Sequence, residues 1–429
     1  MIETLIISLI TCVSLILSIL LFPKVKILKK EINTYWIICL IGALFILLFK
    51  GVSLKELMSG LFADSSINPI KILILFFSMT FLSIFLDEVR FFKFIASVLT
   101  NRCKTNQTSL FFALYALVSV LTIFTSNDIV ILTFTPFICY FCKNTKINPI
   151  PYLIGEFFAA NTLSMTLIIG NPTNIYIASN AGITFMEYFS KMFIIGILTS
   201  ILLCLILLLL FKKQLKQPLI AIEQESNIKS KFLLIVGLIH LISCTVIMAI
   251  SNYINIPMYL VSLGFALSLI IITLIYTIVK KLKTNILRNS LHDLPIAFIP
   301  FLVSMVILIS CLSKTEYIKE LSQLLEEINS PILYGASSFF LGNLLNNIPM
   351  SILYSEIFAS STINLNAIYE VIAASNLCAL FTPLGSLAGM MFLSLVKQQD
   401  IDFSFVKFIK YGFVGIILAI FAFALIILI

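Results

Sequence analysis

Polar side chains and helix-breaking residues gather at four places inside otherwise apolar stretches of the sequence. Two of these places are apices of apolar hairpins, and two interrupt long apolar helices. Their residues are Thr125, Ser126, Asn127 and Asp128 in the first apex, Gly170, Asn171, Thr173 and Asn174 in the first interruption, Asn346 and Asn347 in the second apex, and Thr382, Gly385 and Ser386 in the second interruption. Such groups supply amide and hydroxyl oxygens and free backbone N–H and C=O groups, which suit reversible binding of a small ion or solute. We expect no catalytic residue among them.

Asp128 is the only carboxylate at such an apex. A charge at the centre of a bilayer costs about 2.5–3.5 kcal/mol on insertion scales, so a cation or proton is expected to neutralise it. The alternative is that Asp128 caps the second arm of its hairpin, where Asp satisfies free N–H groups. We expect no cofactor other than a coupling Na⁺ or H⁺, and a sodium ion would lie at Asn127, Asp128 and Asn347.

Glu156 and Glu370 lie at corresponding positions, 14 residues before Gly170 and 13 before Pro383. A proton relay is one interpretation. The interpretation we favour is structural, because each carboxylate lies about two turns from its helix start and can reach interfacial water. The sequence has neither a phosphate-binding loop nor a zinc-spaced cluster, so transport driven by ATP bound to this chain is not expected.

The whole composition is that of a membrane protein. Of 429 residues, 60% are hydrophobic and 11% charged, whereas soluble domains carry about 25% charged residues. A span needs roughly 20 apolar residues. Simple spans are predicted near residues 4–22, 34–49, 69–86, 188–211, 232–250, 257–279, 294–312 and 405–428. In a membrane protein the placement of the basic residues that give the net charge of +8 determines the topology. We therefore expect membrane lipid and a small solute as partners, and no nucleic acid.

The two halves repeat the same order of elements. Each has three spans, an amphipathic piece (88–101 and 315–328), a re-entrant hairpin, a broken helix and a final span. The first repeat is 1–212, with its hairpin at 107–142 and broken helix at 150–178; a cytoplasmic linker is 213–230; the second repeat is 231–429, with its hairpin at 331–360 and broken helix at 364–396. Five crossings per half invert the second copy, as in many secondary transporters. The predicted fold is therefore an all-α polytopic membrane protein with about ten transmembrane helices, two re-entrant hairpins and two broken helices.

The distribution of basic residues predicts the orientation. Alternating the loops places 22 of the 28 Lys and Arg residues on one face, and only Lys50, Lys55, Lys71, Lys191, Lys314 and Lys319 on the other. The first face is therefore predicted to be cytoplasmic. Both termini would then lie outside the plasma membrane, with the first hairpin entering from the cytoplasm and the second from outside.

The chain resembles the ion transporter superfamily over its whole length, most closely the arsenite permease and citrate-type branch. Ser126-Asn127-Asp128 with Thr133-Phe134-Thr135-Pro136 resembles the first hairpin motif of the arsenite permeases, Asn346-Asn347-Ile348-Pro349 resembles the second, and Phe381 to Ala388 resembles their last broken helix. The dicarboxylate symporters carry Ser-Asn-Thr at both apices, and this chain does not. The resemblance implies a site formed by the apices and breaks.

These observations predict an ion-coupled secondary transporter that moves a small inorganic or organic anion, or arsenite, by alternating access. A sodium/proton antiporter is the alternative, and an integral membrane enzyme is the less favoured alternative of another class, because the polar residues lie at mid-membrane breaks. The sequence is compatible with a homodimer and with a separate ATPase partner.

Overall fold

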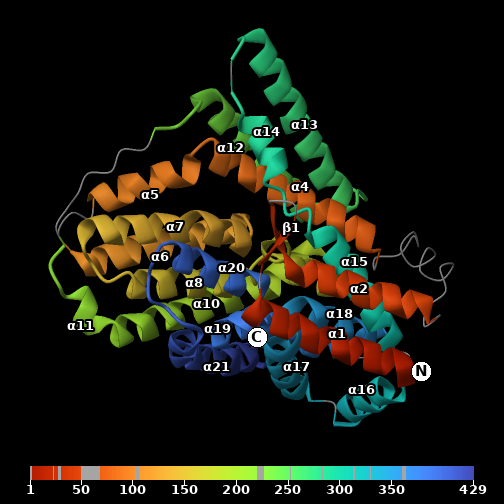
Figure 1. Cartoon of the computed structure of the whole chain (residues 1–429). Helices are drawn as coiled ribbons and strands as arrows, with labels where there is room; N and C mark the ends of the chain where they lie inside the picture. The colour runs from red at the N-terminus through yellow and green to blue at the C-terminus, as the bar shows by residue number, and fades with distance from the viewer. Residues whose placement is uncertain are drawn as a thin grey trace.

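The computed structural model describes residues 2–22, 24–27, 30–49, 68–102, 106–219, 227–251, 253–282, 284–312, 315–328, 330–359 and 364–429 (Figure 1). The described residues are nearly all helical, and six of the helices that they form are long and apolar enough to cross a membrane on their own. The eight predicted simple spans correspond to α1 (Ile2–Leu21), α2 (Thr34–Leu48), α4 (Pro69–Glu88), α10 (Phe185–Leu210), α12 (Lys231–Ala249), α13 (Met258–Val279), α15 (Phe298–Leu312) and α21 (Phe405–Leu428). The predicted fold class is confirmed.

Each predicted hairpin is a pair of helices with a polar turn. The first comprises α6 (Gln107–Phe124) and α7 (Asn127–Thr145), and the second comprises α17 (Pro331–Leu345) and α18 (Asn347–Ala359). Asn346 joins the second pair with φ of 83° and ψ of 152°, a backbone conformation that residues with a side chain rarely adopt. Position 360, the predicted end of this hairpin, lies outside the described residues. The apolar arms and polar turns in the sequence thus correspond to real helix pairs.

Each predicted broken helix consists of two α-helices separated by a short 3₁₀ turn. The first is α8 (Ile150–Leu163), η1 (Ile168–Gly170) and α9 (Pro172–Asn180); the second is α19 (Leu365–Phe381), η2 (Pro383–Gly385) and α20 (Leu387–Gln398). The side chains of Asn171 and Ser386 accept hydrogen bonds from backbone N–H groups of α9 and α20, so each second half has its own N-cap. A backbone N–H group at the start of each second half therefore has a hydrogen-bond partner, which helps to stabilise the break inside the membrane.

The second repeat is inverted relative to the first. Tyr152 near the start of α8 donates a hydrogen bond to Gln107 Oε1 at 3.1 Å, so α8 begins beside the open end of hairpin one. Tyr369 near the start of α19 donates to the carbonyl oxygen of Glu187 at 3.2 Å. Glu187 lies in the first turn of α10, the end of that helix away from Gln107. The corresponding helices α8 and α19 therefore begin on opposite sides of the molecule.

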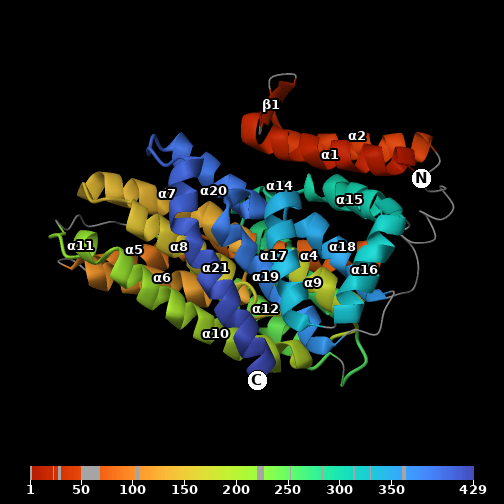
Figure 2. The ribbon, with the colours of Figure 1, turned by 90° about the horizontal axis from the view of Figure 1, so that it is seen from below.

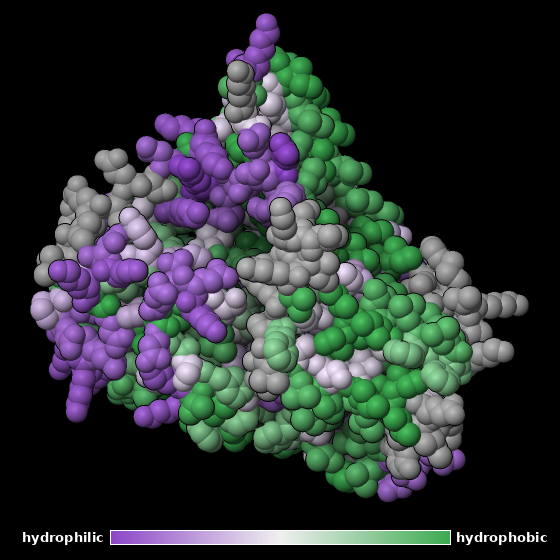
Figure 3. Space-filling model, viewed as in Figure 1, coloured by the Kyte–Doolittle hydropathy of each residue, from purple (hydrophilic) through white to green (hydrophobic). Residues whose placement is uncertain are grey.

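Hydrophilic residues gather on one side, around α5 (Phe91–Arg102), α11 (Lys212–Leu215) and α14 (Ile286–His292), as Figure 3 shows. Two side-chain contacts link separate segments of the chain on this side. Lys229 Nζ lies 3.1 Å from Glu88 Oε2, and Gln107 Nε2 donates to the carbonyl oxygen of Pro218 at 3.1 Å. We call this side the lysine-rich face and the other side the opposite face. Lys50, Lys55 and Lys314, predicted for the opposite face, lie outside the described residues, as do positions 220–226 of the predicted linker.

The two amphipathic pieces agree with the predicted order of elements, and one small β-hairpin was not predicted. The amphipathic pieces are α5 and α16 (Glu316–Ile328), close to their predicted bounds. The prediction of an all-α chain missed a small β-hairpin between α1 and α2, in which β1 (Lys24–Ile27) pairs antiparallel with β2 (Lys30–Asn33). Its alternating Lys-Val-Lys-Ile pattern is short, and it lies between two strong helical signals. Figure 2 shows α1 and α2 lying along one side of the molecule, next to α15.

Candidate functional site

A cavity of about 310 Å³ lies between α2, α4, α7, α15 and α20. Thr34, Asp293 and Gln398 line its mouth, where α2 begins, α14 leads into α15 and α20 ends. Ser126 and Asp128 of the first hairpin line its inner end. The cavity therefore connects the lysine-rich face with the turn of hairpin one. We call it the open cavity.

The lining of the open cavity is polar at a few points and carries no basic side chain among the described residues. Its carboxylates are Asp128 and Asp293, and its remaining polar groups are hydroxyls and the Gln398 amide. Met390 and Met391 of α20 add two thioether sulfurs. Polar groups that are few and directed into a mostly apolar space are typical of small-molecule sites. The charge of this lining does not complement a multiply charged anion.

Asp128 presents its carboxylate to the open cavity and does not act as the helix cap. The N-cap of α7 is Ser126, whose hydroxyl accepts from the backbone N–H of Asp128 at 3.3 Å, and Asn127 Oδ1 accepts from the same N–H at 2.9 Å. No hydrogen bond or ion pair from the described residues reaches the Asp128 carboxylate. The alternative interpretation of Asp128 as a cap is therefore wrong, because its neighbours perform that role.

Asn376 of α19 is the centre of a buried hydrogen-bond network that sequence reasoning missed. Its Oδ1 accepts from Ser164 Oγ at 2.7 Å and from Asn171 Nδ2 at 2.9 Å. Its Nδ2 donates to Asn174 Oδ1 at 2.7 Å and to the carbonyl oxygen of Ile372 at 2.8 Å. Both halves of the first broken helix are thus bonded to the second broken helix through one amide.

The network extends to both hairpin turns. Asn127 Nδ2 donates to Asn161 Oδ1 at 3.0 Å, and Ser164 also donates to the carbonyl oxygen of Asn161 at 2.8 Å. At the other end, the hydroxyls of Thr173 and Ser375 are 3.0 Å apart, and Asn347 Nδ2 donates to the carbonyl oxygen of Ser375 at 3.1 Å. The network therefore joins hairpin one, both broken helices and hairpin two into one unit.

A signal for the missed asparagines exists in the internal repeat. Asn161 lies seven residues before Ile168, the start of η1, and Asn376 lies seven residues before Pro383, the start of η2. Each donates to the carbonyl oxygen four residues earlier, Asn161 to Phe157 at 2.9 Å and Asn376 to Ile372. Aligning the repeats at their breaks would have placed these two side chains at equivalent positions.

The remaining predicted site residues make three kinds of hydrogen bond: between hairpin two and η2, within one helix, and at a helix cap. Thr382 Oγ1 donates to Asn343 Oδ1 at 2.7 Å, and Asn346 Nδ2 donates to the carbonyl oxygen of Leu384 at 3.0 Å, so these two link hairpin two to η2. Thr125 Oγ1 donates to the carbonyl oxygen of Leu121 at 2.7 Å within its own helix. Ser386 caps α20. The three residues predicted to bind sodium make different contacts. Asn127 and Asn347 belong to the network around Asn376, whereas Asp128 faces the open cavity.

The glycines of the two breaks allow close backbone approach. A Cβ on Gly170 would lie 2.2 Å from the carbonyl oxygen of Ser164, and a Cβ on Gly385 would lie 2.7 Å from that of Cys378. Neither distance is compatible with a side chain. Gly170 and Gly385 therefore shape the breaks, and the structure gives them no contact with the open cavity.

The expectation that Glu156 and Glu370 reach interfacial water is wrong, because both are buried, with 2% and 0% of their surfaces exposed. Thr135 Oγ1 lies 3.1 and 3.0 Å from the two carboxyl oxygens of Glu156. Both carboxyl oxygens of Glu370 have no hydrogen-bond partner among the described residues, and a Cβ on Gly335 would lie 2.6 Å from Glu370 Oε2. The hairpin arms cover both helix starts, which the local sequence does not reveal.

The inverted repeat contains a second, nearly closed counterpart of the open cavity. The open cavity lies between α7 and α20, and a void of about 10 Å³ lies between α18 and α9. By repeat position, α18 corresponds to α7 and α9 to α20. Phe298 of α15 lines both spaces. The two halves thus form similar walls around spaces of very different size.

Known proteins resemble this chain along most of its length. The citrate transporter family (CitMHS) matches residues 25–371. The arsenical pump membrane protein of Escherichia coli K12 is 24% identical over 366 residues, covering 79% of this chain and 81% of that protein. A Dictyostelium discoideum protein, whose name describes it as a transporter, arsB, is 32% identical over 178 residues, which is 41% of this chain and 30% of that protein.

A solved structure resembles the fold. The YdaH transporter of Alcanivorax borkumensis superposes with a TM-score of 0.51 at 11% sequence identity, over 99% of this chain and 97% of that chain. At this identity the likeness concerns the fold alone. The paired hairpins, the paired breaks and the family match over residues 25–371 together show that this multi-pass membrane protein belongs to the citrate transporter family.

Proposed function

We propose that this chain is an ion-coupled secondary transporter that moves arsenite across the plasma membrane by alternating access. The observation that carries the proposal is the lining of the open cavity. Arsenous acid is uncharged at neutral pH, and its hydroxyls match the Ser126 and Thr34 hydroxyls and the Gln398 amide. The polarizable thioethers of Met390 and Met391 suit a soft metalloid centre. The name of the Escherichia coli relative supports the same substrate.

The same lining argues against citrate as the substrate, despite the name of the family. A multiply charged anion would meet Asp128 and Asp293 in a cavity without a described lysine, arginine or histidine. Like charges that are close together repel strongly where solvent is sparse. A neutral solute does not meet this repulsion, and a coupling cation is attracted by the Asp128 carboxylate at the inner end of the cavity.

A sodium/proton antiporter is the second candidate function. It is favoured by the Asp128 carboxylate, which faces the open cavity with no protein partner among the described residues. Such a carboxylate could bind a coupling cation, or could itself be the whole transport site. The two functions differ in whether arsenite moves.

Alternating access is supported by the unequal pair of spaces around the inverted repeat. The space between α7 and α20 measures about 310 Å³, and its counterpart between α18 and α9 about 10 Å³. In an inverted repeat, exchanging the conformations of the two halves closes one space and opens the other. A ligand that binds one conformation more tightly shifts this equilibrium.

The flux of arsenite into proteoliposomes tests the proposal directly. Purified chain is reconstituted, a proton or sodium gradient is imposed, and arsenite, citrate, phosphate and sodium are followed in parallel. We expect gradient-dependent arsenite flux and no citrate flux above empty liposomes. Sodium exchange for protons without arsenite movement would replace the proposal by the antiporter, and gradient-driven citrate flux would contradict the argument from the cavity lining.

The proposed orientation places the lysine-rich face in the cytoplasm, following the positive-inside rule. Both termini then lie outside, and the open cavity faces the cytoplasm, where an exporter collects its substrate. A reporter fused after Ile429 checks this prediction: a periplasmic phosphatase fusion should be active and a cytoplasmic fluorescent fusion inactive. A cytoplasmic C-terminus would reverse the proposed direction of access.

A further inference from the structure

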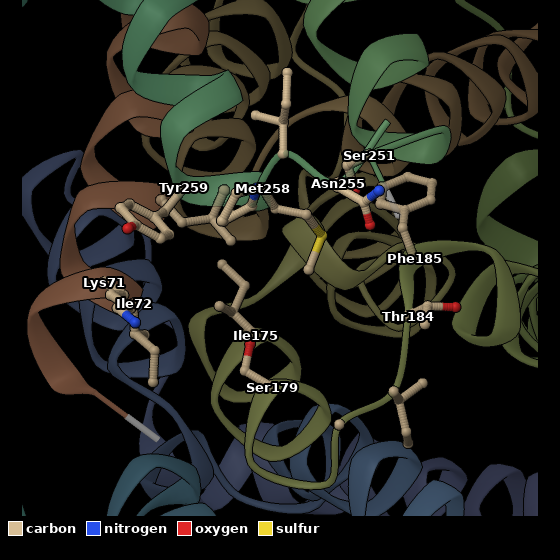
Figure 4. Close-up of a pocket in the computed structure, with 15 residues that line it drawn as sticks. Lys71, Ile72, Ile175, Ser179, Thr184, Phe185, Ser251, Asn255, Met258 and Tyr259 are labelled. Atoms are coloured by element: carbon tan, nitrogen blue, oxygen red, sulfur yellow. The ribbon is translucent and has the colours of Figure 1, made fainter. Parts of the chain in front are cut away.

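A pocket of about 440 Å³ lies on the opposite face of the molecule (Figure 4). Its walls come from the start of α4, the end of α9, the segment leading into α10 and the segment between α12 and α13. In Figure 4, Lys71 and Tyr259 lie on one side of the space, and Thr184 and Phe185 lie on the other. We call it the opposite-face pocket.

The opposite-face pocket adjoins the void described above. Ile72 of α4 lines both the pocket and the void, and Phe298 of α15 lines both the void and the open cavity. Both side chains are buried, with 3% and 4% of their surfaces exposed. The three spaces therefore follow one another through the protein, and Ile72 and Phe298 separate them.

The pocket differs from the open cavity in charge. Lys71 is the basic side chain of its lining, and its Nζ lies 5.7 Å from the centroid of the Tyr259 ring. Hydroxyl and amide groups of Ser179, Thr184 and Asn255 are also in the lining. The pocket is therefore more polar than a space filled only by lipid, and suits a small solute that carries hydroxyl groups.

We infer that the opposite-face pocket is the second vestibule of the transport route, which receives the same small hydroxylated solute as the open cavity, and that Ile72 and Phe298 form the apolar barrier between the two. The inference rests on the proposed function for the identity of the solute. A narrow apolar constriction excludes water and polar solutes. The barrier prevents both ends of the route from being open at once, which coupled transport requires.

Access to introduced thiols tests the inference in the full-length chain. Ile72→Cys, Ser179→Cys and Leu73→Cys are expressed separately, and a membrane-impermeant thiol reagent is applied from each face of sealed vesicles. Leu73 is the matched control, because it is buried on α4 beside Ile72 and lines none of the described pockets. The unsubstituted chain gives the background from native cysteines.

We expect Ser179→Cys to react from the opposite face without any gradient. Ile72→Cys should react slowly at rest and roughly tenfold faster from that face during turnover, as the population of the other conformation rises. Leu73→Cys should stay at background throughout. A turnover-independent rate at position 72 while flux continues, or reaction of Ser179→Cys only from the lysine-rich face, would overturn the inference.

The design separates this inference from the proposed function. Arsenite flux is measured in the same vesicles, and the reaction at position 72 is also followed under an imposed sodium or proton gradient without arsenite. Failure of arsenite flux with gradient-dependent reaction at position 72 would refute the substrate and support the route. If Ile72→Cys does not fold, Phe298→Cys decides the question. It lines the open cavity and should react from the lysine-rich face at rest and from the opposite face only during turnover, and reaction from the lysine-rich face alone during turnover would overturn the inference.

Discussion

Asp128→Asn is expected to insert and fold like the parent chain and to lose gradient-driven flux by roughly 10- to 100-fold. Interactions with a charged group contribute about 1.5–3 kcal/mol, and each 1.4 kcal/mol corresponds to about a tenfold change in binding. Asn keeps the size of the side chain and removes the charge that would bind the coupling cation or proton. Folding should be spared because the N-cap of α7 is made by Ser126 and Asn127, which accept from the backbone N–H at position 128, and not by the Asp128 side chain.

The matched control for this prediction is Asp293→Asn. Asp293 lines the same cavity at its mouth, is exposed, and lies 3.0 Å from His292 Nδ1. Removing this exposed charge should change flux less than twofold, because surface ion pairs contribute little. The measurement is initial arsenite uptake at several imposed pH and sodium gradients. Parent-like flux and an unchanged gradient dependence in Asp128→Asn would exclude the coupling role and leave Asn127 and the hairpin amides as candidates.

Asn376→Leu should lower the stability of the chain and abolish flux. Leu has about the same length but leaves Asn171 Nδ2 and Asn174 Oδ1 without their partner in the buried network. Each buried polar group that loses its partner costs about 1–3 kcal/mol. Ser164 at the end of α8 keeps its second bond to the carbonyl oxygen of Asn161, so the loss falls mainly on Asn171 and Asn174 at the start of α9. Thermal unfolding in detergent and flux in proteoliposomes measure the two effects.

Asn366→Leu is the control on the same helix. Asn366 lies in the first turn of α19 with a half-buried side chain outside the network, and substitutions at such positions usually change stability by about 0.5 kcal/mol or less. Asn376→Asp is a graded test, because it keeps the acceptor for Ser164 and Asn171 and loses the donor to Asn174. An unfolding midpoint of Asn376→Leu equal to that of Asn366→Leu would show that the network does not hold the two breaks together.

The hairpins, breaks and their inverted order could be predicted from the sequence because their signals are local. Prolines and glycines interrupt apolar runs at Pro172 and Pro383, and polar residues mark the turns. The centre of the network could not be found this way. Asn376 lies inside an uninterrupted helix, and its partner Asn171 is 205 positions away, so nothing beside it in the chain distinguishes it from an ordinary helical residue.

The predicted site residues divide in the structure for a similar reason. The local sequence shows which side chains need polar surroundings, but it does not show whether water or another side chain provides them. Asp128 faces the open cavity, whereas Asn171 and Asn174 are occupied by Asn376. The burial of Glu156 and Glu370 depends on how hairpin arms cover the helix starts, which is a tertiary property. The β-hairpin at Lys24–Asn33 was missed because strand signals of four residues are weak beside long apolar helices.

The division of the buried network between the halves has a consequence for biogenesis. Asn171 and Asn174 emerge from the ribosome some 200 residues before Asn376, their common partner. During that interval the first half is inserted while Asn171 Nδ2 and Asn174 Oδ1 lack their partner in the second half, a state that costs free energy until the second half arrives. Docking of the halves is then the step that completes folding. The first half on its own should accordingly be a preferred substrate for membrane quality-control proteases.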